Sequence, residues 1–215
     1  MANPISLDRV KSDPTSAELY TKRKSRKHLG EMQMLAKANA SLPSSSVRKF
    51  LDAPCGVGRA TAWLSSLGYR VHGIDLGESA VTYTRNLLRE EGVEATVENQ
   101  NIFDLDYEDG EFDATLCFRL IHHFNEEKTR AALIAELCRV SSQFVLLSYI
   151  SPYSVTSIKR KIRHMLTGKP IKQNATTLKE IESHFGDNGF ASFYRVKRSQ
   201  ILHSLQLVVF RRENI

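Results

Sequence analysis

Residues 51–59 read Leu51-Asp52-Ala53-Pro54-Cys55-Gly56-Val57-Gly58-Arg59. The apolar run from Val47 to Ala53 predicts a strand, and the residues from Ala60 to Leu64 predict a helix. Glycine between a strand and a helix lets the backbone turn sharply. It also lets a ligand approach the N–H groups at the start of the helix. We therefore expect a ligand-binding turn at the carboxyl end of this strand.

Strands and helices continue to alternate after this turn. The pattern predicts further strands over residues 69–75, 95–99, 112–117 and 144–149, and helices over residues 79–91, 126–140 and from 177 to about 189. Two last β-rich runs, 192–196 and 202–210, have no helix between them and predict an antiparallel hairpin. The expected fold class is α/β: a doubly wound, mostly parallel seven-stranded sheet with an antiparallel C-terminal hairpin, Rossmann-like.

The composition indicates one ordinary globular domain. Of the 215 residues, 41% are hydrophobic and 25% are charged. No apolar run approaches the roughly 20 residues of a membrane span, and the first residues show no signal peptide. The scattered Cys55, Cys117 and Cys138 argue against a disulfide framework or a zinc site, so we expect a cytoplasmic protein. The net charge of +6 hints at an anionic partner.

Two acidic residues flank the glycine turn and narrow the choice of ligand. Asp75 ends the second predicted strand, where a carboxylate can accept both ribose hydroxyls of a nucleoside. The sequence motif of a dinucleotide-binding site has a third glycine at the position where this chain has Thr61. The chain instead has Asp52 just before the turn, where it could meet the ammonium group of an amino-acid ligand.

These residues resemble the first motif of the class I S-adenosylmethionine-dependent methyltransferases, an acidic residue followed by GxGxG, with Pro54 at the first glycine position. The resemblance runs from about Tyr20 to the C-terminus and implies S-adenosylmethionine as cofactor, S-adenosylhomocysteine as product and no metal. The family's adenine-binding Asp is replaced by Asn101, whose side-chain oxygen can still accept a hydrogen bond. The cofactor-binding residues that we expect are Tyr20, Arg23, Asp52, Ala53, Pro54, Gly56, Gly58, Asp75, Leu76, Asn101, Ile102, Phe118 and Arg119.

The segment after the fourth predicted strand reads Cys117-Phe118-Arg119-Leu120-Ile121-His122-His123-Phe124. It resembles the hydrophobic-His-His run of small-molecule methyltransferases of the ubiquinone-biosynthesis type. An acceptor hydroxyl or ammonium must lose a proton, and a neutral histidine is a suitable base near pH 7. His122 or His123 could be this catalytic base, or either could brace the loop. The segment lacks the Asn/Asp-Pro-Pro-aromatic motif of adenine amino-methylases. It also lacks the Pro-Cys nucleophile of cytosine C5-methylases, because the Pro54-Cys55 pair lies in the cofactor turn, where it cannot attack a base. A nucleic-acid acceptor is therefore disfavoured.

The resemblance divides the chain into an N-terminal helical lid with its linker (residues 1–46) and a methyltransferase domain (47–215). Residues 150–176 form a substrate-side insert, in which 155–166 predict a short basic amphipathic helix. This helix could pack on the core as a lid, contact an anionic membrane, or bind RNA. We expect methyl transfer to a small-molecule, lipid-linked or saccharide acceptor. The alternatives are an RNA methyltransferase and a non-catalytic cofactor-binding protein.

Overall fold

The structure of the chain is a computed structural model that describes residues 25–171, 173–196 and 204–213. Its centre is a seven-stranded sheet with the order β3-β2-β1-β4-β5-β7-β6. The first five strands in this order are parallel, and β7 runs antiparallel to both of its neighbours. The strands are β1 (Lys49–Asp52), β2 (Arg70–Asp75), β3 (Thr96–Asn99), β4 (Phe112–Cys117), β5 (Ser141–Ile150), β6 (Phe190–Arg195) and β7 (Leu205–Arg212).

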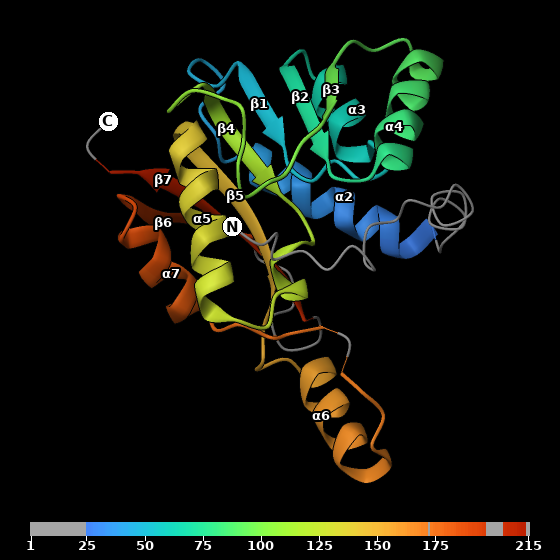
Figure 1. Cartoon of the computed structure of the whole chain (residues 1–215), viewed down its shortest axis with the longest axis vertical. Helices are drawn as coiled ribbons and strands as arrows, with labels where there is room; N and C mark the ends of the chain where they lie inside the picture. Colours follow the sequence, from blue (N-terminus) through green and yellow to red (C-terminus); the bar gives the residue numbers. More distant parts are fainter. Residues whose placement is uncertain (1–24, 172, 197–203, 214–215) are drawn as a thin grey trace.

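Helices cover both faces of the sheet (Figure 1). One face carries α2 (Ser25–Asn39), α3 (Arg59–Ser66) and α4 (Glu78–Glu91), and the other carries α5 (Glu127–Val140) and α7 (Leu178–Gly186). Side chains alternate between the two faces along each strand. In β1, Phe50 joins the core under α2 and α3, whereas Leu51 joins the core under α5 and α7. The predicted doubly wound sheet with its antiparallel C-terminal strands is therefore confirmed.

The strand β5 begins earlier than the sequence predicts. It starts at Ser141, directly after α5, and not at Phe144. The hydroxyl of Ser141 is buried and lies within hydrogen-bond distance of the Leu137 carbonyl (2.7 Å) and of the Thr115 hydroxyl (2.6 Å). These local bonds satisfy a polar side chain inside the sheet, so serines that resemble a loop in the sequence form the first residues of a strand.

The insert contains the predicted amphipathic helix, α6 (Val155–Thr167). It stands at one end of the molecule, away from the sheet (Figure 1). Ile162 is 50% exposed, Met165 82% and Leu166 79%. Of the three alternatives for this helix, packing of its apolar side on the core is therefore not what the described residues show.

Two smaller expectations concern the cysteines and the membrane. Cys55, Cys117 and Cys138 are free thiols and all three are buried. Burial raises the pKa of each thiol above its ordinary value, so these thiols stay protonated at neutral pH. Within the described ranges, every helix is too short or too polar to cross a bilayer.

Candidate cofactor and acceptor site

The turn between β1 and α3 lies where the strand order reverses. The chain leaves β1 toward β2 on one side, while β4 pairs with β1 on the other side. Ligands of doubly wound sheets bind at such a point, outside the carboxyl ends of the strands. Asp52 ends β1, Asp75 ends β2 and Cys117 ends β4, so these residues mark the edge of the sheet that carries the candidate site.

Backbone hydrogen bonds hold the glycine turn against both neighbouring strands. The Ala53 N–H donates to a β4 carbonyl (2.9 Å), and the Cys55 N–H donates to a β2 carbonyl (2.7 Å). The Ala53–Pro54 peptide bond between them is cis. Gly58 has a φ of +77°, and a Cβ at this position would lie 2.5 Å from the side chain of Thr84 in α4. Glycine at 58 is therefore required both by the backbone conformation and by the close approach of α4.

Asp75 joins the turns that follow β1 and β2. Its carboxylate accepts hydrogen bonds from the N–H of Gly56 (3.0 Å) and from the N–H of Gly77 (2.9 Å). Among the described residues, a Cβ added to Gly56 would meet no atom within 4 Å, so the described part of the chain leaves open space at this turn. A carboxylate has about four acceptor positions, so a side chain that braces the turn can also accept from a ribose hydroxyl.

Asp52 is buried, with 1% of its surface exposed. Its carboxylate accepts a hydrogen bond from the hydroxyl of Thr61 in α3 (2.7 Å). Burial raises the pKa of Asp52 to about 7, with a further contribution from the negative charge of Asp75 and an opposing one from Thr61. A cationic ligand beside this carboxyl group would stabilise its charged form.

The residues expected around adenine follow β2 and β3. Leu76 is half-buried, and its carbonyl accepts from the side chain of Asn99 (2.9 Å). The side-chain oxygen of Asn101 accepts from the N–H of Phe103 (3.2 Å), which fixes its direction. Ile102 is 5% exposed and packs into the core under α5. The structure thus leaves Leu76 and Asn101 partly accessible, and Ile102 almost covered.

Glu31 was missed by the sequence analysis, although it connects three parts of the site. It lies in α2 with 4% of its surface exposed. One carboxylate oxygen is 3.0 Å from the Arg119 guanidinium after β4, and the other is 3.6 Å from the guanidinium of Arg59 at the start of α3. The sequence does contain a signal for its burial, because Glu31 is spaced so that it lies on the same side of the helix as the buried apolar residues. Buried acidic residues are uncommon and are paired when they occur. Those apolar residues are Met34, Leu35 and Ala38.

Arg119 adopts a left-handed backbone conformation, with a φ of +65°. This conformation is uncommon for a residue with a side chain, and it persists where the surroundings hold it. The N–H of Arg119 donates to the hydroxyl of Ser148 in β5 (2.6 Å), and its guanidinium pairs with Glu31. Phe118, next to it, is half-buried and packs against the cluster that includes α2.

The two histidines lie in a short 3₁₀ helix, η2 (Ile121–His123), and have different surroundings. The ring of His122 is buried and that of His123 is exposed, with 4.4 Å between the ring centroids. The carbonyl of His122 accepts from the backbone N–H (2.9 Å) and the side chain (3.2 Å) of Asn174. The insert therefore returns to the body beside the histidines.

Two of the expected cofactor residues, Tyr20 and Arg23, lie outside the described residues. Within the described ranges, His, Cys, Asp and Glu form no group of three that could hold a metal ion. The donor set that is present fits S-adenosylmethionine. Asp75 suits the ribose hydroxyls, Asp52 suits an ammonium group, and Gly56 leaves space for a ligand above the turn.

Comparison with known proteins finds similarity to methyltransferases. Residues 50–143 match the family model of a methyltransferase domain. The chain is 32% identical over 95 residues to a ubiquinone biosynthesis O-methyltransferase from Thiobacillus denitrificans, which covers 43% of this chain and 40% of that protein. It is 28% identical over 127 residues to an uncharacterised methyltransferase from Schizosaccharomyces pombe, which covers 58% of this chain and 86% of that protein. The chain thus spans less than half the length of the ubiquinone-biosynthesis relative.

Among solved structures, the fold is similar to that of magnesium protoporphyrin IX methyltransferase from Synechocystis PCC 6803 with bound SAH. The TM-score is 0.71 at 19% identity, and the alignment covers 87% of this chain and 83% of that chain. The domain match begins in β1 and ends in β5, and the shared fold extends over most of the chain, so this chain is similar in sequence and in fold to the class I S-adenosylmethionine-dependent methyltransferases.

Proposed function

We propose that this chain transfers the methyl group of S-adenosylmethionine to a small-molecule acceptor at the carboxyl ends of β4 and β5. The observation that carries the proposal is the Asp75 carboxylate, which holds the N–H groups of Gly56 and Gly77 beside open space. Relatives named for a quinone pathway and for a porphyrin support a small acceptor.

The cofactor roles follow from the chemistry of the side chains. S-adenosylmethionine supplies an electrophilic methyl group on a cationic sulfur. We assign Asp75 to the ribose hydroxyls and Asp52 to the ammonium group, because these carboxylates end adjacent parallel strands. Leu76 and Asn101 are assigned to adenine, since both are partly accessible beyond the ends of β2 and β3. Ile102 supports this side of the site from the core.

The acceptor side of the proposal rests on the segment after β4. Methyl transfer is an in-line displacement, so positioning of the acceptor supplies much of the rate. We assign His123 as the base that removes the acceptor proton, because its ring is exposed next to the end of β4. His122 is buried and bonded through its carbonyl to Asn174, so we assign it to hold the loop.

Calorimetry with S-adenosylmethionine, S-adenosylhomocysteine and NAD tests the cofactor. We expect both methionine-derived ligands to bind far more tightly than NAD, because Thr61 stands where a dinucleotide site has glycine. Tighter binding of NAD would refute the proposal.

Radiolabelled S-adenosylmethionine, incubated with fractionated cell extract, tests the acceptor. We expect the label in small molecules, and the same result after the extract is treated with ribonuclease. Label in RNA would favour an RNA methyltransferase. Tight cofactor binding without transfer to any fraction would favour a non-catalytic cofactor-binding protein.

A further inference from the structure

Among the described residues, the first turn of α6 bonds to the residues that directly follow β5. The hydroxyl of Ser154 caps the helix by accepting from the N–H of Ser157 (3.1 Å). Ser157 is buried, and its own hydroxyl donates to the Ser151 carbonyl (2.6 Å). Beyond this turn, residues 161–171 are all exposed. The helix therefore projects from the molecule with a fixed base (Figure 1).

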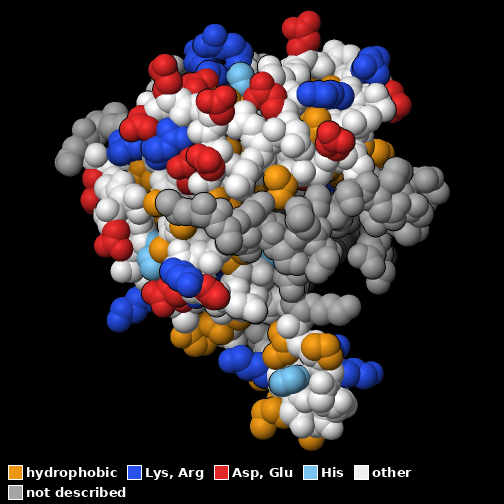
Figure 2. Space-filling view, viewed as in Figure 1, with side chains coloured by type: hydrophobic (Ala, Val, Ile, Leu, Met, Phe, Trp, Pro, Cys, Tyr) orange, Lys and Arg blue, Asp and Glu red, His pale blue; other side chains and the backbone are white. Residues whose placement is uncertain are grey.

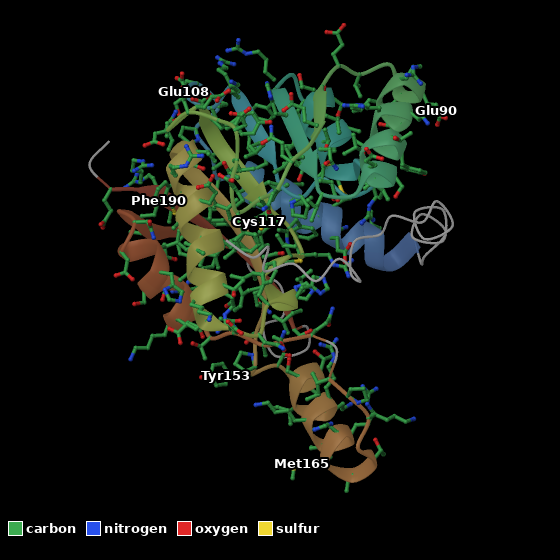
Figure 3. All side chains as sticks on the ribbon, viewed as in Figure 1. Glu90, Glu108, Cys117, Tyr153, Met165 and Phe190 are labelled. Atoms are coloured by element: carbon green, nitrogen blue, oxygen red, sulfur yellow. The ribbon has the colours of Figure 1, made fainter. Side chains whose placement is uncertain are left out.

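The exposed part of α6 has a continuous apolar side. At 100° per residue, its apolar residues lie within an arc of about 100°. Their exposed fractions are 47% for Ile158, 50% for Ile162, 82% for Met165 and 79% for Leu166. Met165 lies near the far end of the helix (Figure 3). Four large aliphatic side chains exposed together indicate a surface that another apolar phase covers.

Five of the remaining positions of α6 are basic. Lys159 and Lys161 flank the apolar arc on its two sides, Arg163 lies beyond Lys159, and Arg160 and His164 lie opposite to the arc. Basic and apolar side chains therefore occur together on this helix (Figure 2). No acidic residue occurs between residues 137 and 179 of the sequence, so no negative charge within this long segment offsets them.

We propose that α6 docks on an anionic lipid bilayer surface. The apolar arc would enter the boundary between headgroups and acyl chains, and Lys159 and Lys161 would extend their amines to lipid phosphates. A polynucleotide backbone would satisfy the basic residues but leave the apolar arc uncovered. A second copy of α6 would cover the arc but bring like charges together, with no acid to pair them.

The two ends of the insert that carries this docking surface are attached next to the acceptor side of the site. The N–H of Thr176 donates to the Ile150 carbonyl at the end of β5 (2.9 Å), and Asn174 bonds to the His122 carbonyl. Both ends of the insert are therefore tied to the carboxyl edge of β4 and β5. The docking surface goes beyond the proposed methyl transfer and does not depend on it.

Co-sedimentation of the full chain with vesicles tests the docking surface. We expect binding to vesicles that contain phosphatidylglycerol and little binding to vesicles of phosphatidylcholine alone. The pair Ile162→Gln and Met165→Gln should lower the partition coefficient at least tenfold, because two aliphatic side chains no longer enter the bilayer. The pair Lys159→Glu and Lys161→Glu should lower it by at least as much, and this effect should shrink with salt.

Matched substitutions on the body are the controls. Leu67→Gln replaces an aliphatic residue that is 49% exposed, and Lys37→Glu with Lys128→Glu makes the same change in net charge away from α6. Both controls should bind vesicles as the wild type does. Circular dichroism and calorimetry with S-adenosylhomocysteine, without vesicles, should show that every variant is folded and binds the cofactor alike.

Three results would overturn the proposal. The first is wild-type binding that is absent, or equal for anionic and neutral vesicles. The second is a loss in the body controls as large as that in the α6 variants. The third is binding of α6 to a second copy of the chain, or to RNA, that persists when vesicles are added and prevents the chain from binding them. A failure of cofactor binding in the wild type would instead refute the methyltransferase proposal and leave the vesicle result unaffected.

Discussion

Thr61 donates its hydroxyl proton to the buried carboxylate of Asp52 across 2.7 Å. The bond joins the first turn of α3 to the end of β1. Gly73 in β2 makes room for it, because a Cβ at Gly73 would lie 3.2 Å from the Thr61 hydroxyl and 3.1 Å from the Cβ of Cys55. A dinucleotide site uses glycine in the helix to bring helix and sheet close together. Here glycine stands in the strand instead, and the helix is held by a hydrogen bond.

Substitution of Thr61 measures the contribution of this bond. Thr61→Val keeps the shape of the side chain but leaves the buried carboxylate without its donor, so we expect a loss of about 1–3 kcal/mol in the free energy of unfolding at pH 8. Thr61→Ser keeps the hydroxyl and should lose less. Urea denaturation of both variants decides between these outcomes, and equal stability of the two would show that the bond contributes nothing.

The pKa of Asp52 makes stability depend on pH. Because the pKa is raised from 3.8 to about 7 on folding, the folded chain binds a proton that the unfolded chain has lost. The contribution of Asp52 to stability is therefore greatest below pH 4, falls as the pH rises, and levels off above pH 7. Between pH 5 and pH 7 we expect the wild type to lose about 2 kcal/mol relative to Asp52→Asn. If the free energies of unfolding of the wild type and of Asp52→Asn changed equally between pH 5 and pH 7, the raised pKa of Asp52 would be contradicted.

The same titration should control cofactor affinity. An ammonium group next to Asp52 favours the carboxylate, so S-adenosylhomocysteine should bind more tightly as the pH rises from 6 to about 8. Methylthioadenosine has no amino-acid group and serves as the matched ligand, with no such increase expected. Calorimetry at several pH values tests both ligands. A pH dependence that persists in Asp52→Asn would place the ammonium group elsewhere.

Two aspartates offer a matched pair for the ribose assignment. Asp75 accepts from two backbone N–H groups at the carboxyl edge of the sheet, and Asp113 accepts from those of Arg48 (2.7 Å) and Lys49 (2.8 Å) at the amino edge. Alanine at either position should cost about 1–3 kcal/mol of stability. Asp75→Ala alone should also weaken S-adenosylhomocysteine binding at least tenfold. Equal affinities in the two variants would remove Asp75 from the ribose site.

The histidines are separated by stability and turnover. His123→Ala should leave thermal stability and cofactor affinity unchanged and lower kcat by roughly 10²–10⁴-fold, since its exposed ring is assigned as the base. His122→Ala leaves a cavity at a buried position, so its main effect should be a lower melting temperature. The measurements are kinetics with the identified acceptor and thermal denaturation. If His123→Ala had the kcat of the wild type, His123 would not be the catalytic base.

Much of the fold follows from local patterns in the sequence. Alternating strands and helices predicted the doubly wound sheet, and β4 was predicted with the bounds Phe112–Cys117 that the structure shows. The helix predicted from residue 177 is α7, and the Thr177 hydroxyl caps its start by accepting from the Glu180 N–H (3.2 Å). These features depend on residues close together in the sequence, which is why pattern alone finds them.

The parts that were not predicted depend on contacts between distant residues. Glu31 and Arg119 are 88 residues apart in the sequence, and nothing local to either residue indicates the ion pair. The left-handed residue Arg119 also bonds to Ser148, which is likewise distant from it in the sequence. Amphipathicity predicted α6 itself but not its surroundings, because an apolar helix side has the same pattern whether a core or another phase covers it.

The strand order has a consequence for the synthesis of the chain. β6 leaves the ribosome before β7, yet within the described sheet β7 lies between β6 and β5. Until residues 205–212 emerge, β6 has no strand to pair with, and the long apolar strand β5 keeps an open edge. Open edges of this kind favour pairing between chains. Nascent chains that stall within residues 150–204 would therefore leave this edge of β5 open to other chains until the last strand fills the gap.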